Sequence, residues 1–466
     1  GSHRVAIGVF EFGFLGGGVG CVVGEKLARL FERAVARDLP VVVLHRTGGA
    51  RMQEGTWSLF QMAKICHAIE SHRATEQPYV SVLADPTMGG GLASSGALGD
   101  VILAEPGARI GFAGPRVVDQ TIGVQLSPGL QTAEMLLENG FVDRIVPPDE
   151  LRAVLVRLIG LGARSPRAAR PTEPSRPLPR VLAPPVERMA SVSAARRLTR
   201  PRFDAWVGSL CDDFLELHGD RLQSDDPTIR GGLARLGDVS IMLVGIDRGS
   251  TQRELGTRNF GMPRPAGYRK AQRLFRLAGK LRLPVVTLVD TPGADPTAEA
   301  ERHGQAFAIA ETIRELTVVD TPVVAVITGE GGSGGALALA TADHLIMLEH
   351  THLSVISPEG CSAILWRDPG SRAPAERRGR AARAMAAMRS VARDLVRCGL
   401  ADEMIQEPQP ASHPLDPAVV DATRAAIETA LERLTALEPA ELQRRRRRRL
   451  FRDRRWIGEE PLDPFG

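Results

Sequence analysis

The sequence predicts an α/β protein built from two tandem halves that share one pattern. Its 466 residues exceed what one ordinary hydrophobic core holds. Short β-branched runs alternate with helical stretches in both halves, and each half has a strand followed directly by a glycine cluster. Such near-continuous apolar strands are typical of parallel sheets covered on both faces. We therefore expect two related, layered α/β domains.

The first half, residues 1–163, is predicted to contain buried strands with helices between them. Strands are expected at Val5–Phe10, Val41–His45, Tyr79–Leu83 and Val101–Ala104, and helices at Leu27–Ala36 and Leu59–Ile69.

The second half, residues 186–466, repeats this order after a segment rich in proline and arginine. Residues 164–185 are interpreted as an exposed, extended linker, and the stretch Val186–Arg200 behind it could become helical against a neighbour. Strands are expected at Ile241–Ile246, Val285–Asp290, Val323–Thr328 and His344–Leu348, and helices at Tyr268–Leu281 and Ala306–Leu316.

The composition excludes several protein classes. Apolar residues make up 43% and charged residues 24%, as in globular proteins, and no apolar run approaches the ~18 residues that a membrane span needs. The five cysteines are scattered without a C-x-x-C pair, which argues against a disulfide scaffold and a zinc site. No secretory pattern opens the chain, so we expect a cytoplasmic protein.

The charge pattern argues against nucleic acid as a partner. The net charge is only +4 and aromatic residues are 4% of the chain, so neither a strong basic surface nor stacking platforms are expected. The run Arg444–Arg449 is the one strong basic patch. We interpret it first as a solvated or acid-paired helix end, with contact to nucleic acid or an acidic partner as the alternative.

The two glycine clusters are the strongest candidates for a functional site. Gly89-Gly90-Gly91 follows a strand of the first half, and the cluster Gly329–Gly335 follows a strand of the second. Glycines at a helix start leave unpaired N–H groups accessible at the positive end of the helix dipole, which suits a developing oxyanion. The alternative is that the glycines only permit tight packing. Their presence at equivalent places of both halves favours the paired site.

Two further turns lie at the carboxyl ends of predicted strands, the usual ligand edge of an α/β sheet. They are Thr47–Glu54 and Asp290–Pro296, and ordinary βα loops are the alternative interpretation. No P-loop is present, and the G-x-G-x-x-G spacing within Gly329–Gly334 lacks a following ribose-binding acid. No nucleophile constellation emerges either. The pattern favours chemistry performed by backbone dipoles together with a cofactor.

These motifs resemble those of the bacterial acetyl-CoA carboxylase carboxyltransferase family. In the first half the motifs that begin at Phe10 (FEFGFLGG), Gly48 (GGARMQE), Asp85 (DPTMGG) and Ile110 (IGFAGPRV) look like the β subunit. In the second half those that begin at Arg258 (RNFGMP), Asp290 (DTPGA), Gly329 (GEGGSGGA) and Val355 (VISPEGC) look like the α subunit. The resemblance covers nearly the whole chain outside the linker, in the order of a β/α fusion.

The resemblance implies two crotonase-like (ββα-spiral) domains, with a site where a β-like domain meets an α-like one. Carboxybiotin on a separate carrier protein, charged by a biotin carboxylase, would donate its carboxyl group to acetyl-CoA or a related short acyl-CoA. The product would be malonyl-CoA, used in fatty acid biosynthesis, or its homologue. Biotin itself would act as the base, no metal is implied in this chain, and a homodimer would correspond to the α2β2 assembly of separate subunits.

The resemblance also assigns roles to individual residues. It places backbone oxyanion holes at Gly89 and Gly90 and at Gly334 and Gly335. Valine at Gly90 or Gly335 is therefore expected to block the oxyanion with little effect on stability. The substrate-binding residues that it implies are Gly48, Gly49, Ala50, Arg51, Met88, Phe112, Gly293, Ala294 and Ser333.

The sequence departs from the family pattern in three places. The four-cysteine zinc ribbon of the β subunit is not found in it, Asp295 and Thr297 stand where the family shows tyrosine and glycine, and the family's lysine-bearing motif is altered at residues 249–258. These changes bear on the carboxyl donor and on acyl preference. Two alternatives therefore stay open: a biotin-independent acyl-CoA decarboxylase or hydrolase on the same scaffold, and an inert or regulatory subunit.

Overall fold

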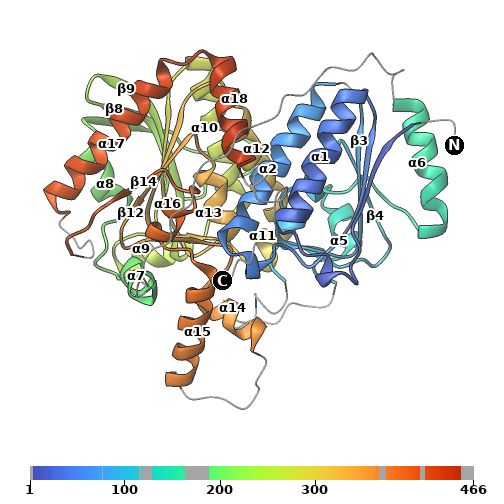
Figure 1. Cartoon of the computed structure of the whole chain (residues 1–466), viewed down its shortest axis with the longest axis horizontal. Helices are drawn as coiled ribbons and strands as arrows, with labels where there is room; N and C mark the ends of the chain where they lie inside the picture. Colours follow the sequence, from blue (N-terminus) through green and yellow to red (C-terminus); the bar gives the residue numbers. More distant parts are fainter. Residues whose placement is uncertain are drawn as a thin grey trace.

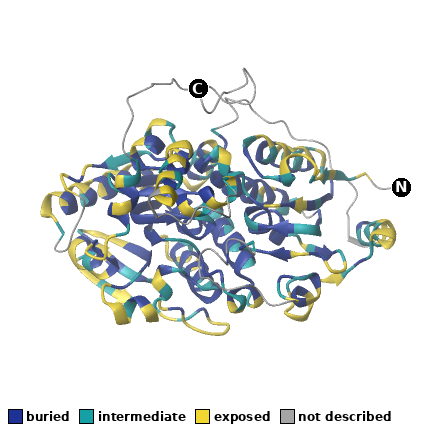
Figure 2. Ribbon diagram, turned by 90° about the horizontal axis from the view of Figure 1, so that it is seen from below, coloured by how far each residue is buried: buried dark blue, intermediate teal, exposed yellow. Residues whose placement is uncertain are grey.

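The protein forms two α/β halves side by side, as the computed structural model in Figure 1 shows. The structure describes residues 4–75, 77–114, 118, 129–162, 188–366, 374–409 and 415–452. The linker predicted at 164–185 lies outside these residues. Figure 2 shows that the buried residues gather on the strands and on the helix faces turned toward them, while exposed residues lie on the outer helix faces.

The first half builds a parallel sheet in the order β1-β2-β3-β4-β6, with β5 paired to the end of β3. Its strands are β1 (Ala6–Val9), β2 (Val41–Thr47), β3 (Tyr79–Met88), β4 (Val101–Ala104), β5 (Ile110–Gly111) and β6 (Arg144–Ile145). Its helices are η1 (Leu15–Gly17), α1 (Cys21–Arg37), η2 (Met52–Glu54), α2 (Thr56–Arg73), α3 (Gly89–Leu92), η3 (Gly96–Leu98), α5 (Ala133–Glu138) and α6 (Pro148–Gly162).

The second half builds a larger, mixed sheet in the order β14-β12-β11-β10-β9-β8-β7, with β13 paired to the end of β11. Strand β8 runs antiparallel to both of its neighbours, β7 and β9, and the core strands β9 to β12 run parallel. The strands are β7 (Asp213–Glu216), β8 (Ile229–Leu236), β9 (Val239–Ile246), β10 (Val285–Thr291), β11 (Val323–Gly332), β12 (His344–Leu348), β13 (His352–Ser354) and β14 (Glu403–Ile405).

Helices cover both faces of this second sheet (Figure 1). Before the central strands come α7 (Arg188–Ala195), α8 (Phe203–Leu210), α9 (Gln252–Thr257), η4 (Asn259–Gly261) and α10 (Pro265–Leu281). Among and after them come α11 (Ala298–Arg302), α12 (Gln305–Val318), α13 (Ser333–Ala340), α14 (Pro358–Leu365), α15 (Pro374–Met388), α16 (Ala392–Arg397), α17 (Pro417–Thr435) and α18 (Pro439–Leu450).

The central strand pairs of the two halves follow the same register. Strands β2 and β3 pair regularly until an irregularity after His45, beyond which Thr47 pairs with Thr87. Strands β10 and β11 do the same, and beyond the irregularity Thr291 pairs with Gly331. In each half the long strand, β3 or β11, then continues and pairs with a short strand, β5 or β13. The halves are therefore related along their central strands.

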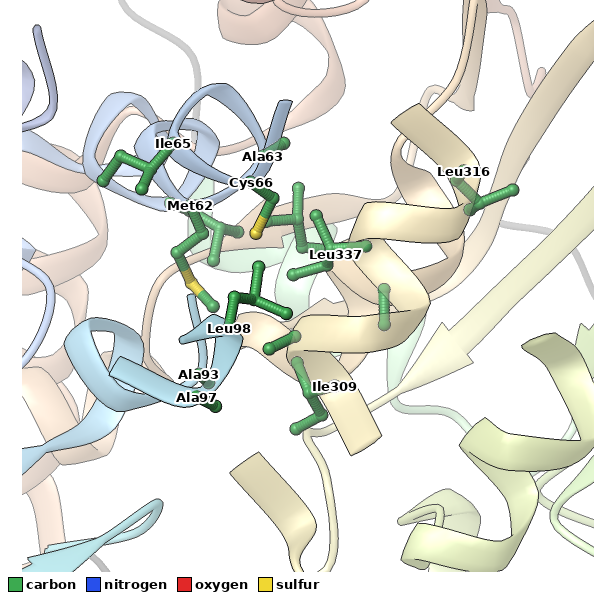
Figure 3. Packing of buried hydrophobic residues seen from close by; sticks show 14 of the residues in the cluster. Met62, Ala63, Ile65, Cys66, Ala93, Ala97, Leu98, Ile309, Leu316 and Leu337 are labelled. Atoms are coloured by element: carbon green, nitrogen blue, oxygen red, sulfur yellow. The ribbon is translucent and has the colours of Figure 1, made fainter. Parts of the chain in front are cut away.

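The two halves share one hydrophobic core. Helix α2 is buried around almost its whole circumference, as expected for a helix enclosed on all sides. It packs on α1 within the first half and on α12 and α13 of the second. Figure 3 shows Met62 and Cys66 of α2 beside Ile309 and Leu337 of the second half. The interface between the two halves is thus closely packed and apolar.

The predicted elements are confirmed. Each strand and helix expected from the sequence is present, with ends that differ by a few residues or extend further. The stretch expected to become helical carries α7. The arginine run forms the end of α18 and is largely acid-paired: Arg446 is buried against Asp343 at 2.7 Å, and Arg447 reaches Glu32 of the first half at 2.5 Å.

Candidate functional site

Each glycine cluster is a sharp turn from a long strand into a helix. At the end of β3, Met88 is extended (φ −127°, ψ 160°) and Gly89 turns to φ +60° to begin α3. At the end of β11, Gly332 is extended (φ −88°, ψ 112°) and Ser333 turns to φ +56° to begin α13. We call these the first turn (residues 88–91) and the second turn (residues 332–335). A left-handed residue followed by helical ones points successive N–H groups into one concavity that suits an anion.

The strand register shows which residues of the two turns correspond. Met88 pairs with Gly111 of β5, and Gly332 pairs with Ser354 of β13, so these two residues end their strands equivalently. Gly89 therefore corresponds to Ser333, and Gly90 corresponds to Gly334. The pair that matches Gly89 and Gly90 in space is Ser333 and Gly334, one residue before the pair Gly334 and Gly335 singled out by the sequence.

A preceding loop lies against each turn and is built in the same way. Thr47 Oγ1 accepts the N–H of Gly49 at 3.0 Å, and Thr291 Oγ1 accepts the N–H of Gly293 at 3.0 Å. The N–H of Gly48 is also used, since it donates to the Gly16 carbonyl at 2.9 Å. In the described part of the chain, the N–H groups of Ala50 and its counterpart Ala294 make no hydrogen bond.

Loop and turn touch closely in both halves. A Cβ at Gly49 would lie 3.3 Å from the Gly89 Cα and 3.5 Å from the Gly90 nitrogen. A Cβ at Gly335 would lie only 2.5 Å from the Ala294 nitrogen. The structure thus brings Gly48, Gly49 and Ala50 to the first turn, and Gly293 and Ala294 to the second.

The two turns meet at the side chains of Met62 and Phe112. A Cβ at Gly90 would lie 3.1 Å from Met62 Sδ, and a Cβ at Gly334 would lie 3.3 Å from Met62 Cε. The Gly334 Cβ position is also 3.6 Å from the Phe112 ring, whereas the Phe112 carbonyl oxygen is 3.8 Å from the position of a Cβ at Gly89. Phe112 was predicted from the sequence and Met62 was not.

These contacts correct the expectation for valine at the turns. A Cβ at Gly90 or Gly334 would point at core side chains and not into the space where an oxyanion would meet the N–H groups. At Gly335 a Cβ would meet backbone and the Tyr268 hydroxyl at 2.8 Å, which cannot be relieved by a flexible side chain. Valine at Gly335 is therefore expected to disturb the fold.

The remaining predicted residues are Met88, which opens the first turn, and Arg51, which lies in the loop beside it. Met88 is buried and ends β3. Arg51 donates from Nε to Glu54 Oε1 at 2.8 Å, and Glu54 Oε2 accepts the N–H of Cys21 at 2.6 Å. The Arg51 side chain is 22% exposed, so its guanidinium keeps some access to solvent. The loop thus holds Arg51 in place without burying its charge.

A buried ionic network supports the second turn. Asp290 pairs with Arg202 and accepts the N–H of Glu330 at 3.0 Å. Glu330 in turn pairs with Arg196 at 2.7 Å and with Arg248 at 2.8 Å. Burial alone would raise the pKa of Glu330, but the two guanidinium groups outweigh burial and lower it to about 2. The carboxylate is therefore ionised at neutral pH.

The described residues contain no group of three or more His, Cys, Asp or Glu side chains placed to hold a metal. All five cysteines lie in the described residues, and no two of them are joined in a disulfide. None of the described helices combines the length and the hydropathy that crossing a membrane requires.

Comparison with known proteins places this geometry in a family. Residues 180–453 match the family model described as acetyl co-enzyme A carboxylase carboxyltransferase-like. The chain is 50% identical over 458 residues to the acetyl-coenzyme A carboxylase carboxyl transferase subunits beta/alpha of Salinispora arenicola, covering 97% of this chain and 79% of that protein. This chain belongs to the acetyl-CoA carboxylase carboxyl transferase family.

Two further relatives agree with the assignment. The carboxyl transferase subunits beta/alpha of Saccharopolyspora erythraea are 44% identical, over 96% of this chain and 77% of that protein. A probable biotin-dependent acyl-coenzyme A carboxylase beta3 subunit of Mycobacterium bovis is 37% identical, over 97% of this chain and 88% of that protein. The matches to the relatives extend across both halves of this carboxyltransferase-family chain, so the resemblance to a β/α fusion is confirmed.

The sequence missed two features of the site. Met62 lies on a helix without an apolar periodicity, so the pattern marks the whole helix as buried but does not single out one residue. Ser333 takes the position of Gly89 although it carries a side chain. The strand register and the backbone angle reveal the correspondence, and a search for paired glycines cannot detect it.

Proposed function

We propose that this chain transfers a carboxyl group from carboxybiotin, held on a separate carrier protein, to acetyl-CoA or a related short acyl-CoA. The observation that carries the proposal is the pair of equivalent turns in the two halves of a carboxyltransferase-family member. Two oxygen atoms gain negative charge in such a transfer, one on the acyl thioester and one on the carboxyl donor. Two preorganised sets of N–H donors are what this chemistry needs.

Each turn offers one pair of donors. In the first half, the N–H of Ala50 and the N–H of Gly90 lie on the touching loop and turn, and in the second half Ala294 and Gly334 take the same places. The first three or four N–H groups of a helix have no partner within that helix. We assign the first pair to the acyl-CoA oxygen and the second pair to the oxygen of the carboxyl donor.

The residues present fit a carrier-bound biotin in one respect that can be checked. No side chain caps the N-terminus of α13, which begins at Ser333 in the second turn. Its first N–H groups are therefore available to hydrogen-bond the ureido oxygen of biotin. When bound, biotin would supply the carboxyl group and accept the α-proton. The chain's own contribution is to bind, orient and polarise the two oxygen atoms, so no side-chain base is required.

We propose that the halves are crotonase-like domains, supported by the repeated register of their strands, with a boundary within residues 164–185. We propose a homodimer, for which the exposed apolar side chains of Ile7, Val9, Phe14 and Leu15 provide surface. We also propose a reducing, cytoplasmic location, in keeping with cysteines that are not joined in disulfides.

An assay of the purified chain tests the function. We expect transfer to acetyl-CoA or another short acyl-CoA in the presence of biotinylated carrier protein, biotin carboxylase, ATP and bicarbonate, and no transfer when the carrier is not biotinylated. Release of CO2 or free acid from malonyl-CoA without any biotin would instead favour a decarboxylase or hydrolase. Complete inactivity toward a panel of acyl-CoAs would favour an inert subunit. Light scattering should give twice the 50.2 kDa chain mass.

A further inference from the structure

Glu301 reaches from the second half into the first. It lies on α11, is only 3% exposed, and directs its carboxylate at the end of β5. Its Oε1 accepts the N–H of Phe112 at 2.8 Å and the N–H of Ala113 at 3.0 Å. It also accepts from Gln131 Nε2 at 2.8 Å, and the Phe112 N–H is shared with Oε2 at 3.1 Å. One carboxylate therefore satisfies three donors of the other half.

The residue that Glu301 holds is the one that joins the two turns. Phe112 directly follows β5, whose Gly111 pairs with Met88 at the start of the first turn. Its carbonyl faces the first turn and its ring packs at the second. Because Phe112 contacts both turns, a displacement of Phe112 would shift the surroundings of both donor pairs together. A buried carboxylate that binds backbone N–H groups is an effective clamp, because hydrogen bonds to charged groups are the stronger ones.

Gln131 completes the clamp from a third segment. Its Nε2 also donates to the Ala113 carbonyl at 2.7 Å, and its backbone carbonyl accepts the N–H of Ile110 at 2.7 Å. Both sides of the segment 110–113 are thus hydrogen-bonded, with Glu301 as the only charged group that contacts its N–H groups among the described residues.

We propose that Glu301 is a positioning residue for carboxyl transfer, whose ionised carboxylate holds Phe112 between the first and second turns. The proposal rests on the proposed function, because it concerns the rate of that reaction. It assigns no contact between Glu301 and the reacting atoms. Loss of the charge is expected to lower the rate by loosening Phe112, while substrate binding changes little.

The environment of Glu301 makes this charge sensitive to pH. Burial raises its pKa to about 7, against the lowering effect of the N–H groups of Ala113 and Phe112 and of Gln131, and nearby Asp295 raises it further. Asp295 itself faces Arg264 at 3.4 Å. Below about pH 7 the carboxyl group therefore gains a proton, and the charge-assisted bonds to the segment 112–113 weaken.

The decisive variant is Glu301→Gln, because glutamine keeps the shape and one acceptor oxygen but carries no charge. Glu299→Gln is the matched control, since Glu299 lies on the same helix and is exposed. We expect kcat of the Glu301→Gln variant to fall roughly tenfold at pH 8, with KM for the acyl-CoA changed less than about threefold. The wild type should lose activity below about pH 7, and the variant should lack that acid limb. The control should match the wild type in both respects.

Amide hydrogen exchange in residues 110–114 separates this proposal from the proposed function. We expect these amides to exchange faster in Glu301→Gln than in Glu299→Gln at pH 8, whether or not the chain transfers carboxyl groups. Normal protection in the variant would overturn the proposal, even if the chain proves active. Equal kcat and an unchanged acid limb in a folded Glu301→Gln protein would overturn it as well, leaving Glu301 a purely structural contact.

Discussion

The first and second turns have the same backbone path but different support behind them. Behind the first turn lie hydrogen bonds between uncharged groups: His45 Nε2 lies 3.0 Å from Ser95 Oγ, and Thr87 Oγ1 donates to the His45 carbonyl at 3.0 Å. Behind the second turn, Asp290 and Glu330 are buried with arginines. The same backbone path is thus supported by hydrogen bonds between uncharged groups in the first half and by buried ion pairs in the second.

The origin of the difference is the segment that opens the second half. Arg196 directly follows α7, which packs on β11 and β13, and Arg202 is the N-cap residue of α8. By register, Asp290 corresponds to Arg46, which is exposed and donates to the Asp85 carbonyl at 2.6 Å. The covered position holds a buried acid with arginine partners, whereas the open position holds a solvated base. The charges are therefore buried because the segment that opens the second half covers them, and not because the turn requires it.

The largest expected effect is on the ionic side. Glu330→Ala removes the buried partner of Arg196 and leaves Arg248 with the longer 3.4 Å contact to Asp290, and breaking such a buried pair costs about 3–5 kcal/mol of unfolding free energy. Glu359→Ala is the control, because Glu359 also pairs with Arg196 but is 53% exposed, and about 1 kcal/mol or less is expected. Urea titration measures both. Similar small losses would show that the network does not stabilise the second turn.

A second test compares one buried histidine behind each turn, His45 in the first half and His352 in the second. Burial lowers the pKa of His45 to about 4, and that of His352 likewise, despite Glu330 beside it. The unfolded chain therefore binds more protons than the folded protein between pH 6.5 and 4, so stability falls as the pH decreases through this window. Each histidine should contribute a loss of about 2 kcal/mol between pH 7 and pH 5.

Replacing either histidine with glutamine should remove its share of this pH dependence. Urea unfolding at pH 7 and pH 5 of His45→Gln and His352→Gln measures it. If only His45→Gln flattens the profile, the ionic network holds a proton on His352 and the two sides differ more than the structure indicates.

The smallest effect concerns the left-handed residue of each turn. Gly89→Ser places a side chain at φ +60° and should cost about 1–2 kcal/mol. Ser333→Gly should change stability by less than about 1 kcal/mol, because relief of strain at φ +56° is offset by the greater freedom of glycine in the unfolded chain. Thermal unfolding measures both. A large gain from Ser333→Gly would mean that serine strains the second turn.

The sequence predicts the elements of this fold well and the contacts between its halves poorly. Strands such as Val323–Thr328 are apolar runs bounded by glycine, so both their type and the turn after them can be predicted. Glu299 and Glu301, in contrast, stand two residues apart in one short polar stretch, yet one is exposed and the other is buried. No local pattern distinguishes them, because the burial of Glu301 depends on the position of Phe112, 189 residues away.

The site residues divide in the same way. Gly49, Gly90 and Ala294 could be identified because their motifs resemble a family, and the structure places them at the turns. The ionic support of Glu330 could not be predicted, since its partners lie on three separate segments of the chain. The arginine run shows the converse case: its pairing with acids was predicted, but the full burial of Arg446 was not.

The central claim is that both turns act through their backbone N–H groups, and it can be tested by removing single N–H groups. Replacing Gly90 or Gly334 with glycolic acid exchanges the N–H for an ester oxygen and adds no side chain. The exposed Gly208 of α8 serves as the control position. We expect each turn variant to lose roughly 10²-fold or more in the rate of carboxyl transfer, and the Gly208 variant to lose less than about threefold. Unchanged transfer by folded Gly90 and Gly334 esters would contradict the account, and would show that the glycines only allow the strands and helices to pack.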